Sequence, residues 1–452
     1  MGRGSYMKNV GRGFPSCPYT VQFAVIGSEI FALQYYIYTQ PKNLLMTKHI
    51  SIILLAMSLA LAARQFFPSF SYIGERDGDD LPNGNGVGLY SGGLLSGLFG
   101  NTDPLKDGVY DGEWKAGKRV GEGVFVSHGN KYEGYWRDDD LRYGKAEYTD
   151  FDHFSFNTKR PLNMKLVLES SKASTSSSAI VSASYEGFFF QLMPNGVGKM
   201  TCGDYTYDGQ WSLGRRSGFA RENGGPLVLF EDDVQLDVNI ITDKRIYGID
   251  ISHYQPVVRW DKLYVTVDST YTYNDTIEKQ IGVIPVSFVF LKATEGGTYK
   301  DSEYLKHCDW AERFGIPHGA YHFYNHREAT VKQQIDNFTQ TVKLRKGDLL
   351  PVLDIELFGV PTDSILVWVD AVEKHYGVKP IVYASERIAQ SYIDNTKLKN
   401  YTLWHARYGH VPTRPFHIHQ YSERGRVKGI EYHEIDLDTL SQGLTVDSLR
   451  KK

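Results

Sequence analysis

The chain has little cysteine and no block of like charge. Only 3 of its 452 residues are cysteine, and Cys17, Cys202 and Cys308 are far apart. This spacing excludes a disulfide framework and a zinc site built from neighbouring cysteines. The formal net charge is −3, so the chain would gain little from the counterion release that drives non-specific nucleic-acid binding. We therefore expect no nucleic-acid partner.

Long hydrophobic runs are also scarce, and the one that exists is Ile50–Ala63. A spanning helix needs roughly 20 apolar residues, whereas a signal-peptide core needs roughly 7–15. We expect residues 49–67 to be a signal peptide or a membrane anchor. Residues 1–48 are then a tail, from either an over-called start codon or a cytoplasmic segment. Both alternatives place the rest of the chain outside the cytoplasm.

Residues 68–108 are expected to be a linker, because Asp77–Gly100 is rich in Gly, Asn and Asp.

An internal repeat follows, and we assign residues 109–240 to it. An aromatic residue, a glycine two positions on and a second aromatic two further recur four times. The copies are Tyr110-Asp-Gly-Glu-Trp114, Tyr132-Glu-Gly-Tyr-Trp136, Tyr185-Glu-Gly-Phe-Phe189 and Tyr207-Asp-Gly-Gln-Trp211.

Strand alternation puts both aromatics of each copy on one face, with the glycine on the other. We expect the glycines that follow, in Gly117–Gly123 and Gly196–Gly198, to mark hairpin turns. Such hairpins cannot bury a face alone, so they must stack. The array resembles MORN repeats, which implies an all-β scaffold or spacer that docks a protein or a lipid.

From Ile246 onward, short apolar runs alternate with segments of helical period. The runs are Ile246–Ile251, Val286–Ala293, Gly319–Phe323, Leu350–Ile355, Ile381–Ala384, Leu403–Ala406 and Ile418–Tyr421. Helices are expected at Thr330–Lys343 and at Asp363–Tyr376, the latter capped by Thr362 and ended by Gly377. This alternation predicts a parallel α/β fold, most simply a TIM-like barrel.

Acidic residues stand at or near the ends of several of these runs. Asp250 ends the first run, Glu295 follows the second, Asp354 and Glu356 end the fourth, and Asp436 lies near the chain's end. In a parallel barrel the carboxyl ends of strands meet at one rim. Adjacent carboxylates raise one another's pKa, and a protonated acid near neutrality is what a glycosidic leaving oxygen requires.

Residues 245–452 resemble glycoside hydrolase family 25, the Chalaropsis-type muramidases. The matching segments are Gly248–Gln255, Phe290–Gly296, Gly319–Tyr324, Pro351–Glu356, Ile381–Ser385, Leu403–Tyr408, Gln420–Ser422 and Gly429–Leu437. The resemblance implies a flattened, irregular β/α barrel with fewer helices than strands. It also implies hydrolysis of the β-1,4 bond between N-acetylmuramic acid and N-acetylglucosamine in peptidoglycan, without a metal or cofactor. Such an enzyme would work in the bacterial cell envelope, periplasmic or membrane-anchored, or be secreted.

Carried across residue by residue, the resemblance makes Glu356 the general acid and places three other acids at the floor of the site. These acids are Asp250, Asp354 and Asp436. It implies substrate-binding roles for Tyr324, Tyr383, Gln420, Glu295 and His419. The sequence departs from the family at His419, where Trp is usual, at Asp438, where Asn is usual, and in an insertion over Tyr264–Ile284.

The mechanism stays open at this point, because carboxylates at i and i+2 can fall between the separations of retaining and inverting enzymes. A third route uses the substrate's N-acetyl group as nucleophile, with Asp354 orienting it, and we favour it slightly.

Two other functions remain as alternatives. One is a zinc-dependent peptidoglycan amidase, for which His318 with His322, or His417 with His419, would have to supply ligands. The other is a wall-binding protein without activity. A chitinase is disfavoured because its longer run of acids on one strand is missing.

Overall fold

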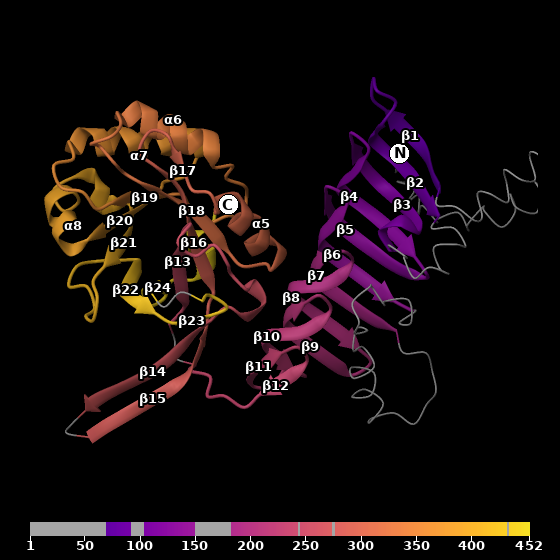
Figure 1. Ribbon diagram of the computed structural model, residues 1–452, viewed down its shortest axis with the longest axis horizontal. Helices are drawn as coiled ribbons and strands as arrows, with labels where there is room; N and C mark the ends of the chain where they lie inside the picture. The colour runs from indigo at the N-terminus through magenta and orange to yellow at the C-terminus, as the bar shows by residue number, and fades with distance from the viewer. Residues whose placement is uncertain (1–68, 92–103, 150–181, 243–244, 274–275, 432–433) are drawn as a thin grey trace, which may run out of the picture.

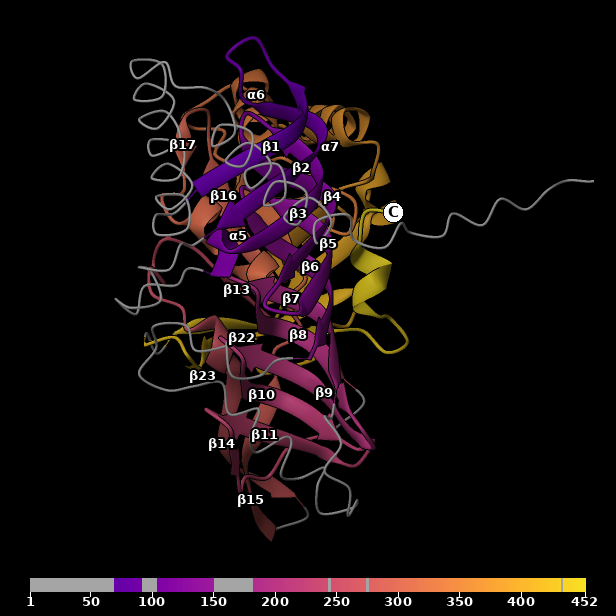
Figure 2. The same cartoon turned by 90° about the vertical axis from the view of Figure 1, so that its right-hand side faces the viewer.

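The computed structural model describes residues 69–91, 104–149, 182–242, 245–273, 276–431 and 434–452. These residues form a twelve-stranded sheet and a closed barrel that lie side by side (Figures 1 and 2). The expected signal or anchor segment at 50–63 falls outside the described residues. Within the described ranges, no helix combines the length and apolar character needed to cross a membrane.

The twelve-stranded sheet, called here the repeat sheet, is antiparallel throughout and follows chain order. Its strands stack from β1 at one end to β12 at the other (Figure 1). Their bounds are β1 Ser69–Arg76, β2 Pro82–Ser91, β3 Gly108–Lys115, β4 Lys118–Ser127, β5 Asn130–Arg137, β6 Asp140–Tyr148, β7 Ala183–Phe190, β8 Met193–Cys202, β9 Tyr205–Ser212, β10 Arg215–Glu222, β11 Leu227–Glu231 and β12 Val234–Leu236. A short 3-10 helix, η1 (Pro104–Lys106), precedes β3.

The repeated aromatics form the buried face of this sheet, as expected. Those at the repeat positions are Tyr110, Trp114, Tyr132, Trp136, Tyr185, Phe189, Tyr207 and Trp211, all at most 3% exposed. The indole of Trp136 donates to the carbonyl of Gly123 at 3.1 Å. A Cβ at Gly123 would lie 2.2 Å from the Tyr110 hydroxyl, so only glycine fits there.

The expected role of the later glycines is therefore corrected. Gly117 does lie in a turn, between β3 and β4. Gly121 and Gly123 lie within β4, and Gly196 and Gly198 within β8. Gly123 and Gly198 make room for the rings of Tyr110 and Tyr185 on neighbouring strands instead of forming turns. Gly121 lies against the side chain of Glu113, and Gly196 lies against the backbone of Phe314.

The prediction of a linker over residues 68–108 is partly wrong, because most of residues 69–91 form strands. These residues form β1 and β2, which pair with each other and continue the repeat sheet. Glycine-rich composition suggested a linker, but here it reflects close packing: a Cβ at Gly86 would lie 2.2 Å from Tyr72, and one at Gly88 2.6 Å from Trp114. The sheet therefore begins well before the first recognisable repeat.

The C-terminal part is a closed barrel of eight strands. Seven run parallel, in the order β13, β16, β18, β19, β20, β21 and β22, and antiparallel β24 joins β22 back to β13. The bounds are β13 Tyr247–Ile251, β16 Phe288–Glu295, β18 His318–Phe323, β19 Val352–Ile355, β20 Ile381–Ser385, β21 Thr402–Ala406, β22 Ile418–Gly425 and β24 Ile435–Leu440. All seven expected strands are confirmed, and β24 is an addition.

Four α-helices lie on the outside of the barrel: α5 Tyr304–Arg313, α6 Val331–Thr341, α7 Thr362–Tyr376 and α8 Glu386–Tyr392. Most of the other described elements are strands, so the regular strand–helix alternation of a TIM-like barrel is not confirmed. Gly377 ends α7 with φ 73°, as expected. The expected cap at Thr362 is wrong, because α7 already includes it and Pro361 holds the cap position.

The two faces of the barrel wall have separate cores. The interior contains Phe288, Phe290, Val352, Ile381 and Trp404, while the outer face packs on the helices through residues such as Ile249, Leu353 and Trp368. This alternation follows from the two-residue period of a strand. Shorter elements complete the domain: β17 Tyr299–Lys300, β23 Val427–Lys428, η3 Trp260–Lys262, η4 Lys397–Asn400 and η5 Val446–Leu449.

The insertion at Tyr264–Ile284 forms a long hairpin of β14 (Tyr264–Tyr273) and β15 (Thr276–Pro285). It extends away from the barrel in Figure 1. At its base, β14 pairs with β23, and Val283 packs with Phe219 and Leu229 of the repeat sheet.

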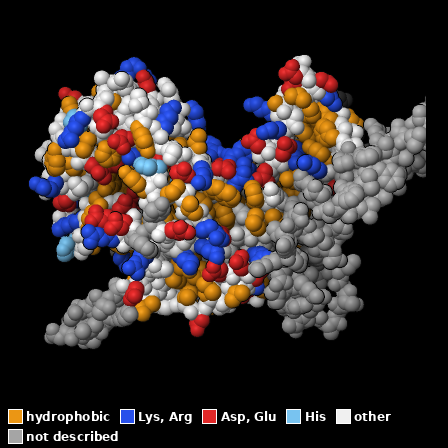
Figure 3. All heavy atoms as spheres, viewed as in Figure 1, with side chains coloured by type: hydrophobic (Ala, Val, Ile, Leu, Met, Phe, Trp, Pro, Cys, Tyr) orange, Lys and Arg blue, Asp and Glu red, His pale blue; other side chains and the backbone are white. Residues whose placement is uncertain are grey.

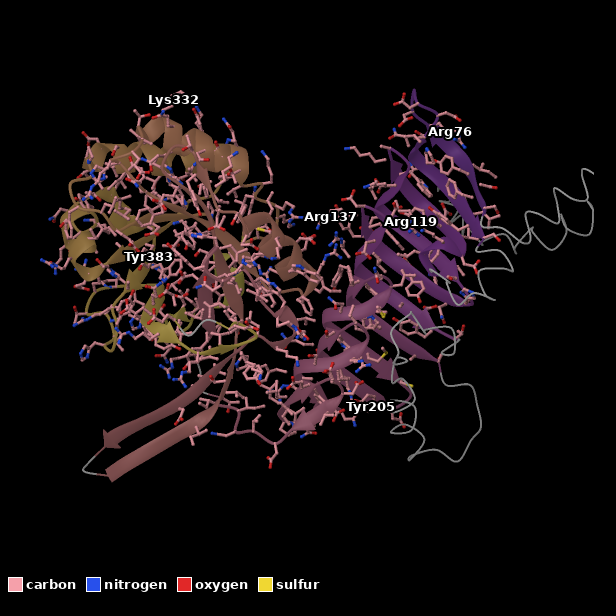
Figure 4. All side chains as sticks on the ribbon, in the orientation of Figure 1. Arg76, Arg119, Arg137, Tyr205, Lys332 and Tyr383 are labelled. Carbon is pink, nitrogen blue, oxygen red and sulfur yellow. The ribbon has the colours of Figure 1, made fainter. Side chains whose placement is uncertain are left out.

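The repeat sheet is joined to the barrel through α5. Asn195 donates to the carbonyl of Arg313 at 3.1 Å, and the Val197 amide donates to the carbonyl of Phe314. The Arg313 guanidinium lies 2.7 Å from Asp140, and Arg142 lies 3.2 Å from Asp309. Figure 4 shows Arg137 reaching from the sheet into the same junction. The sheet is thus packed on the barrel domain rather than loosely tethered to it.

Replacing Arg313 by Met should lower the free energy of unfolding by about 1–3 kcal/mol, because Asp140 and Asp309 lose a charged donor in a partly buried contact. Urea denaturation followed by circular dichroism measures this. Lys332→Met is the matched control, since its ion pair with Asp336 is exposed (Figure 4) and should contribute about 0.5 kcal/mol or less. Equal effects of the two substitutions would contradict a structural role for the junction.

Candidate active site

A pocket opens at the carboxyl ends of the parallel barrel strands. Its lining is mostly acidic, aromatic and amide side chains: Asp250, Lys292, Tyr321, Phe323, Asp354, Glu356, Tyr383, Trp404, Tyr408, Gln420 and Asp436. Figure 4 labels Tyr383 within this part of the barrel. The cavity measures about 140 Å³, well below the roughly 300–1,000 Å³ of sites that enclose a whole ligand. It therefore suits the reacting part of a longer chain.

The four acids predicted to meet at the rim do line this one pocket. Asp250 on β13 lies directly opposite Asp436 on antiparallel β24. Asp354 lies on β19, and Glu356 is the first residue after that strand. Asp354 is buried, whereas Glu356 is exposed at the mouth. The arrangement places one acid within reach of solvent and substrate, with the others grouped nearby.

A hydrogen-bonded chain fixes the floor. The Gln420 amide nitrogen donates to Asp250 at 2.9 Å. The Gln420 amide oxygen accepts from the hydroxyls of Tyr383, at 2.9 Å, and Tyr408, at 3.0 Å. Because both tyrosines donate to that oxygen, the amide nitrogen must point toward Asp250. Tyr383 and Gln420 thus reach the pocket, as predicted.

Burial and mutual repulsion raise the pKa of these acids. Burial raises the pKa of Asp250 well above its usual range, and Asp436 and Asp438 raise it further. Burial also raises the pKa of Asp354, with a contribution from Glu356. The pKa of Asp436 rises to about 6 through burial and the charges of Glu356 and Glu423.

Glu356 is balanced between opposing influences. Its carboxyl lies among pocket side chains, and this partial burial raises its pKa. Lys292 opposes that rise and Glu295 adds to it. Lys292 itself forms an ion pair with Glu295 at 2.7 Å. The two charges therefore act together on the pKa of Glu356 from one side of the pocket mouth.

A fifth acid lies beneath the floor. Asp438 on β24 is fully buried and accepts a hydrogen bond from the Trp404 indole at 2.8 Å. Its other oxygen has no hydrogen-bond partner among the described residues. Burial, and then the charge of Asp436, raise the pKa of Asp438 well above its usual range. The sequence showed Asp438 only as a departure from the family, without a location.

Three predicted substrate-binding residues lie elsewhere. Tyr324 is 1% exposed and packs in the core outside the barrel. His419 is 5% exposed and its Nε2 contacts the Arg407 carbonyl at 2.8 Å. Since Gln420 points inward on β22, the two-residue period turns His419 outward. Glu295 does not line the pocket and instead binds Lys292.

Sequence reasoning missed several residues that line the pocket: Lys292, Tyr321, Phe323, Trp404 and Tyr408. Strand alternation could have found some of them. Tyr321 and Phe323 follow Gly319 at intervals of two on β18, and Trp404 lies two before Ala406 on β21. These inward-facing positions were missed because only acidic residues were sought at the strand ends.

The histidines considered as zinc ligands do not come together. His322 is fully buried, between Thr294 at 2.8 Å and Gln334 at 3.1 Å, and burial lowers its pKa to about 4. His417 accepts from the Leu403 amide. Within the ranges that the structure describes, no group of three or more His, Cys, Asp or Glu side chains has the arrangement of a metal site.

Asp438→Asn should stabilise the protein more at high pH than at low pH. An aspartate whose pKa is raised in the folded state binds a proton that the unfolded chain releases above about pH 4. The contribution of Asp438 to the free energy of unfolding is therefore present in full below that pH and is lost as the pH rises. Asparagine can still accept from Trp404 but carries no charge, so the difference in melting temperature between variant and wild type should grow from pH 4 to pH 8. A difference that is constant or shrinks over this range would show that Asp438 is ionised in the folded protein.

Comparison with known proteins agrees with this geometry. Residues 249–430 match the sequence model described as glycosyl hydrolases family 25. Residues 110–129, 185–206 and 207–222 match the MORN repeat. The chain therefore carries MORN repeats in the sheet and the family 25 signature in the barrel.

Among relatives, the uncharacterized protein YegX of Escherichia coli K12 is 30% identical over 206 residues, which is 43% of this chain and 69% of YegX. Lysozyme M1 of Streptomyces globisporus is 28% identical over 207 residues, covering 41% and 64% of the two chains. A bacterial lysozyme structure from Streptomyces coelicolor aligns at 24% identity with a TM-score of 0.36, covering 45% of this chain and 94% of that one. From the family match and the 30% identity to YegX over 69% of that protein, the chain belongs to glycoside hydrolase family 25.

Proposed function

We propose that the chain is an N-acetylmuramidase that hydrolyses the β-1,4 bond between N-acetylmuramic acid and N-acetylglucosamine in peptidoglycan. The observation that carries this is the pocket in which Asp250, Asp354, Glu356 and Asp436 meet. Similar proteins named Lysozyme M1 and N,O-diacetylmuramidase support the same substrate class. A glycosidase needs such paired carboxyls, one to donate a proton and one to stabilise positive charge at the sugar.

Glu356 is the general acid in this proposal. It is the exposed acid at the mouth, so a glycosidic oxygen can approach it. Burial raises its pKa, which favours the protonated form that a general acid needs. After donating its proton to the leaving oxygen, the carboxylate can accept one from the attacking water.

Asp354 is the partner that orients the substrate. Its Oδ1 is buried and has no hydrogen-bond partner among the described residues. The N–H of an N-acetyl group would satisfy this oxygen, and that contact would aim the acetyl oxygen at the anomeric carbon. The substrate's own acetamido group then acts as the nucleophile, with Asp250 and Asp436 stabilising the positive charge that develops.

We also propose that the enzyme acts outside the cytoplasm, in the cell envelope or after secretion. The apolar run Ile50–Ala63 supports export or anchoring. The substrate class lies on the same side of the membrane. The tight packing of the repeat sheet on α5 would hold the sheet at a fixed position relative to the catalytic pocket.

Glu356→Gln should reduce the release of reducing ends from purified peptidoglycan by roughly 10²–10⁴-fold, because the amide cannot donate the proton that the leaving oxygen needs. Circular dichroism should be unchanged, since the side chain is exposed. Glu373→Gln, on the outer helix α7, is the control and should keep full activity. Activity of Glu356→Gln within a few-fold of wild type would remove Glu356 from the role of acid.

Incubation with EDTA should leave the release of reducing ends unchanged, because the proposed chemistry uses carboxyls alone. A zinc amidase would lose activity on chelation and would release peptides without new reducing ends. Measuring both products before and after EDTA separates the two reactions. Loss of activity that zinc restores would favour the amidase.

A further inference from the structure

A row of aromatic rings runs across the outer face of the repeat sheet near the barrel. Tyr135 on β5 is paired with Tyr143 on β6, which is paired with Phe188 on β7. Neighbouring strands lie roughly 4.8 Å apart, so the three side chains stand in line. Tyr135 and Tyr143 are each 46% exposed, although the repeat aromatics on the other face are buried. We call this set the aromatic row.

The two outer members of the aromatic row, Tyr135 and Phe188, line a groove between the sheet and the barrel. The ring of Phe188 packs on Gly315, where an added Cβ would lie 2.4 Å away. The groove measures about 410 Å³, within the range of sites that bind small molecules. Its lining includes Tyr135, Phe188, Glu312, His318, Arg345 and Lys346. Figure 3 shows the surface hollowed between the two bodies, with Lys and Arg side chains in the hollow.

The groove is separate from the catalytic pocket. His318 is the first residue of β18 and lines the groove, whereas Phe323 is the last residue of that strand and lines the pocket. Five steps of about 3.3 Å place the two residues roughly 17 Å apart along the strand. A ligand in the groove would therefore occupy the end of the barrel opposite to the acids.

The charges of the groove suit a polar, largely uncharged ligand. Glu312 is paired with Arg137 at 2.8 Å and with Arg345 at 3.0 Å. Asp348 lies 3.9 Å from Arg345. Lys346 has no ion pair among the described residues. Both acidic and basic side chains line the groove, so many hydrogen-bonding groups are present without a strong excess of either sign.

We propose that this junction groove, with its aromatic row, binds a glycan strand of the cell wall at a second site distinct from the catalytic pocket. The proposal rests on the proposed function, which supplies the polymer. Sugar rings present C–H faces that stack on exposed tyrosine rings, while their hydroxyls pair with fixed polar side chains. A lipid headgroup would instead call for a cluster of unopposed cations, but Arg345 is opposed by both Glu312 and Asp348.

A second site of this kind matters only for a polymer. Because the groove and the pocket lie at opposite ends of β18, a short glycan in the pocket cannot reach both. An insoluble wall offers many strands, so a strand held in the groove raises the local concentration of bonds near the acids. The groove should therefore affect binding to intact wall and leave turnover of short soluble fragments unchanged.

The test compares Tyr135→Ala/Tyr143→Ala with wild type in two assays. Co-sedimentation with purified peptidoglycan sacculi, with Glu356→Gln added to each chain to stop cleavage, measures binding. Loss of the two ring contacts should weaken this binding by about tenfold. Cleavage of a soluble tetrasaccharide fragment by the chains that retain Glu356 should stay within about twofold, because the pocket is untouched.

Phe70→Ala is the matched control, since Phe70 lies on β1 of the same sheet with the same 46% exposure. It should bind sacculi like wild type. Unchanged binding of the double variant, or an equal loss in Phe70→Ala, would overturn the groove as a glycan site. Failure of wild type to release reducing ends from sacculi would instead overturn the proposed function, so the two failures are distinguishable.

Discussion

The site depends on how the barrel closes. Six parallel pairings bring the strands from β13 round to β22, and antiparallel β24 then joins β22 to β13. This last strand sets Asp436 directly opposite Asp250 and places Asp438 opposite Gly248. A shift of one residue in this pairing would turn both acids to the outer face. Closure in this register is therefore what converts acids distant in the sequence into one cluster.

Keeping the cluster together has a cost in stability that other interactions offset. Buried carboxyls that stay protonated avoid most of the penalty for burying charge. Gln420 holds Asp250, and Trp404 holds Asp438, so part of each group's hydrogen-bonding capacity is met. Among the described residues, an oxygen of Asp354 remains without a hydrogen-bond partner. Such unmet groups are common where a ligand completes the bonding.

The repeat sheet adds a second organised surface to this barrel. Several of its aromatic rings, those of Tyr72, Trp114, Tyr110 and Tyr185, occupy the space that a glycine leaves on a neighbouring strand. The same sheet packs on α5 through ion pairs and backbone hydrogen bonds. The result is an enzyme whose accessory domain has a fixed place beside the catalytic domain, with a groove between them.

Much of this organisation could be predicted from the sequence. The seven parallel strands were visible because strands buried on both faces read as continuous apolar runs. β24 was missed because in Ile-Asp-Leu-Asp-Thr-Leu the polar positions usually face solvent, whereas here Asp436 and Asp438 face the barrel interior. β1 and β2 were missed because glycine and asparagine there resemble a linker.

The predicted acids came together because Asp250, Asp354 and Glu356 lie at or near the carboxyl ends of parallel strands. Asp436 lies at the amino end of antiparallel β24, which reaches the same rim of the barrel. Tyr324 and His419 were misplaced because family position alone did not say which face of the barrel wall they occupy. Strand parity would have corrected His419, since its neighbour Gln420 points inward. The groove at the domain junction could not be predicted, because it depends on how two separately folded parts pack.

The most direct test of the account is a pH titration of the side-chain carboxyls by carbon NMR in the full chain. The account predicts a carboxyl that titrates near pH 6 and disappears in Asp436→Asn, together with others in the pocket that remain protonated above the usual aspartate range. If every carboxyl titrated between about pH 3 and 5, as in model peptides, the acids would not share a buried pocket and the catalytic assignment would be contradicted.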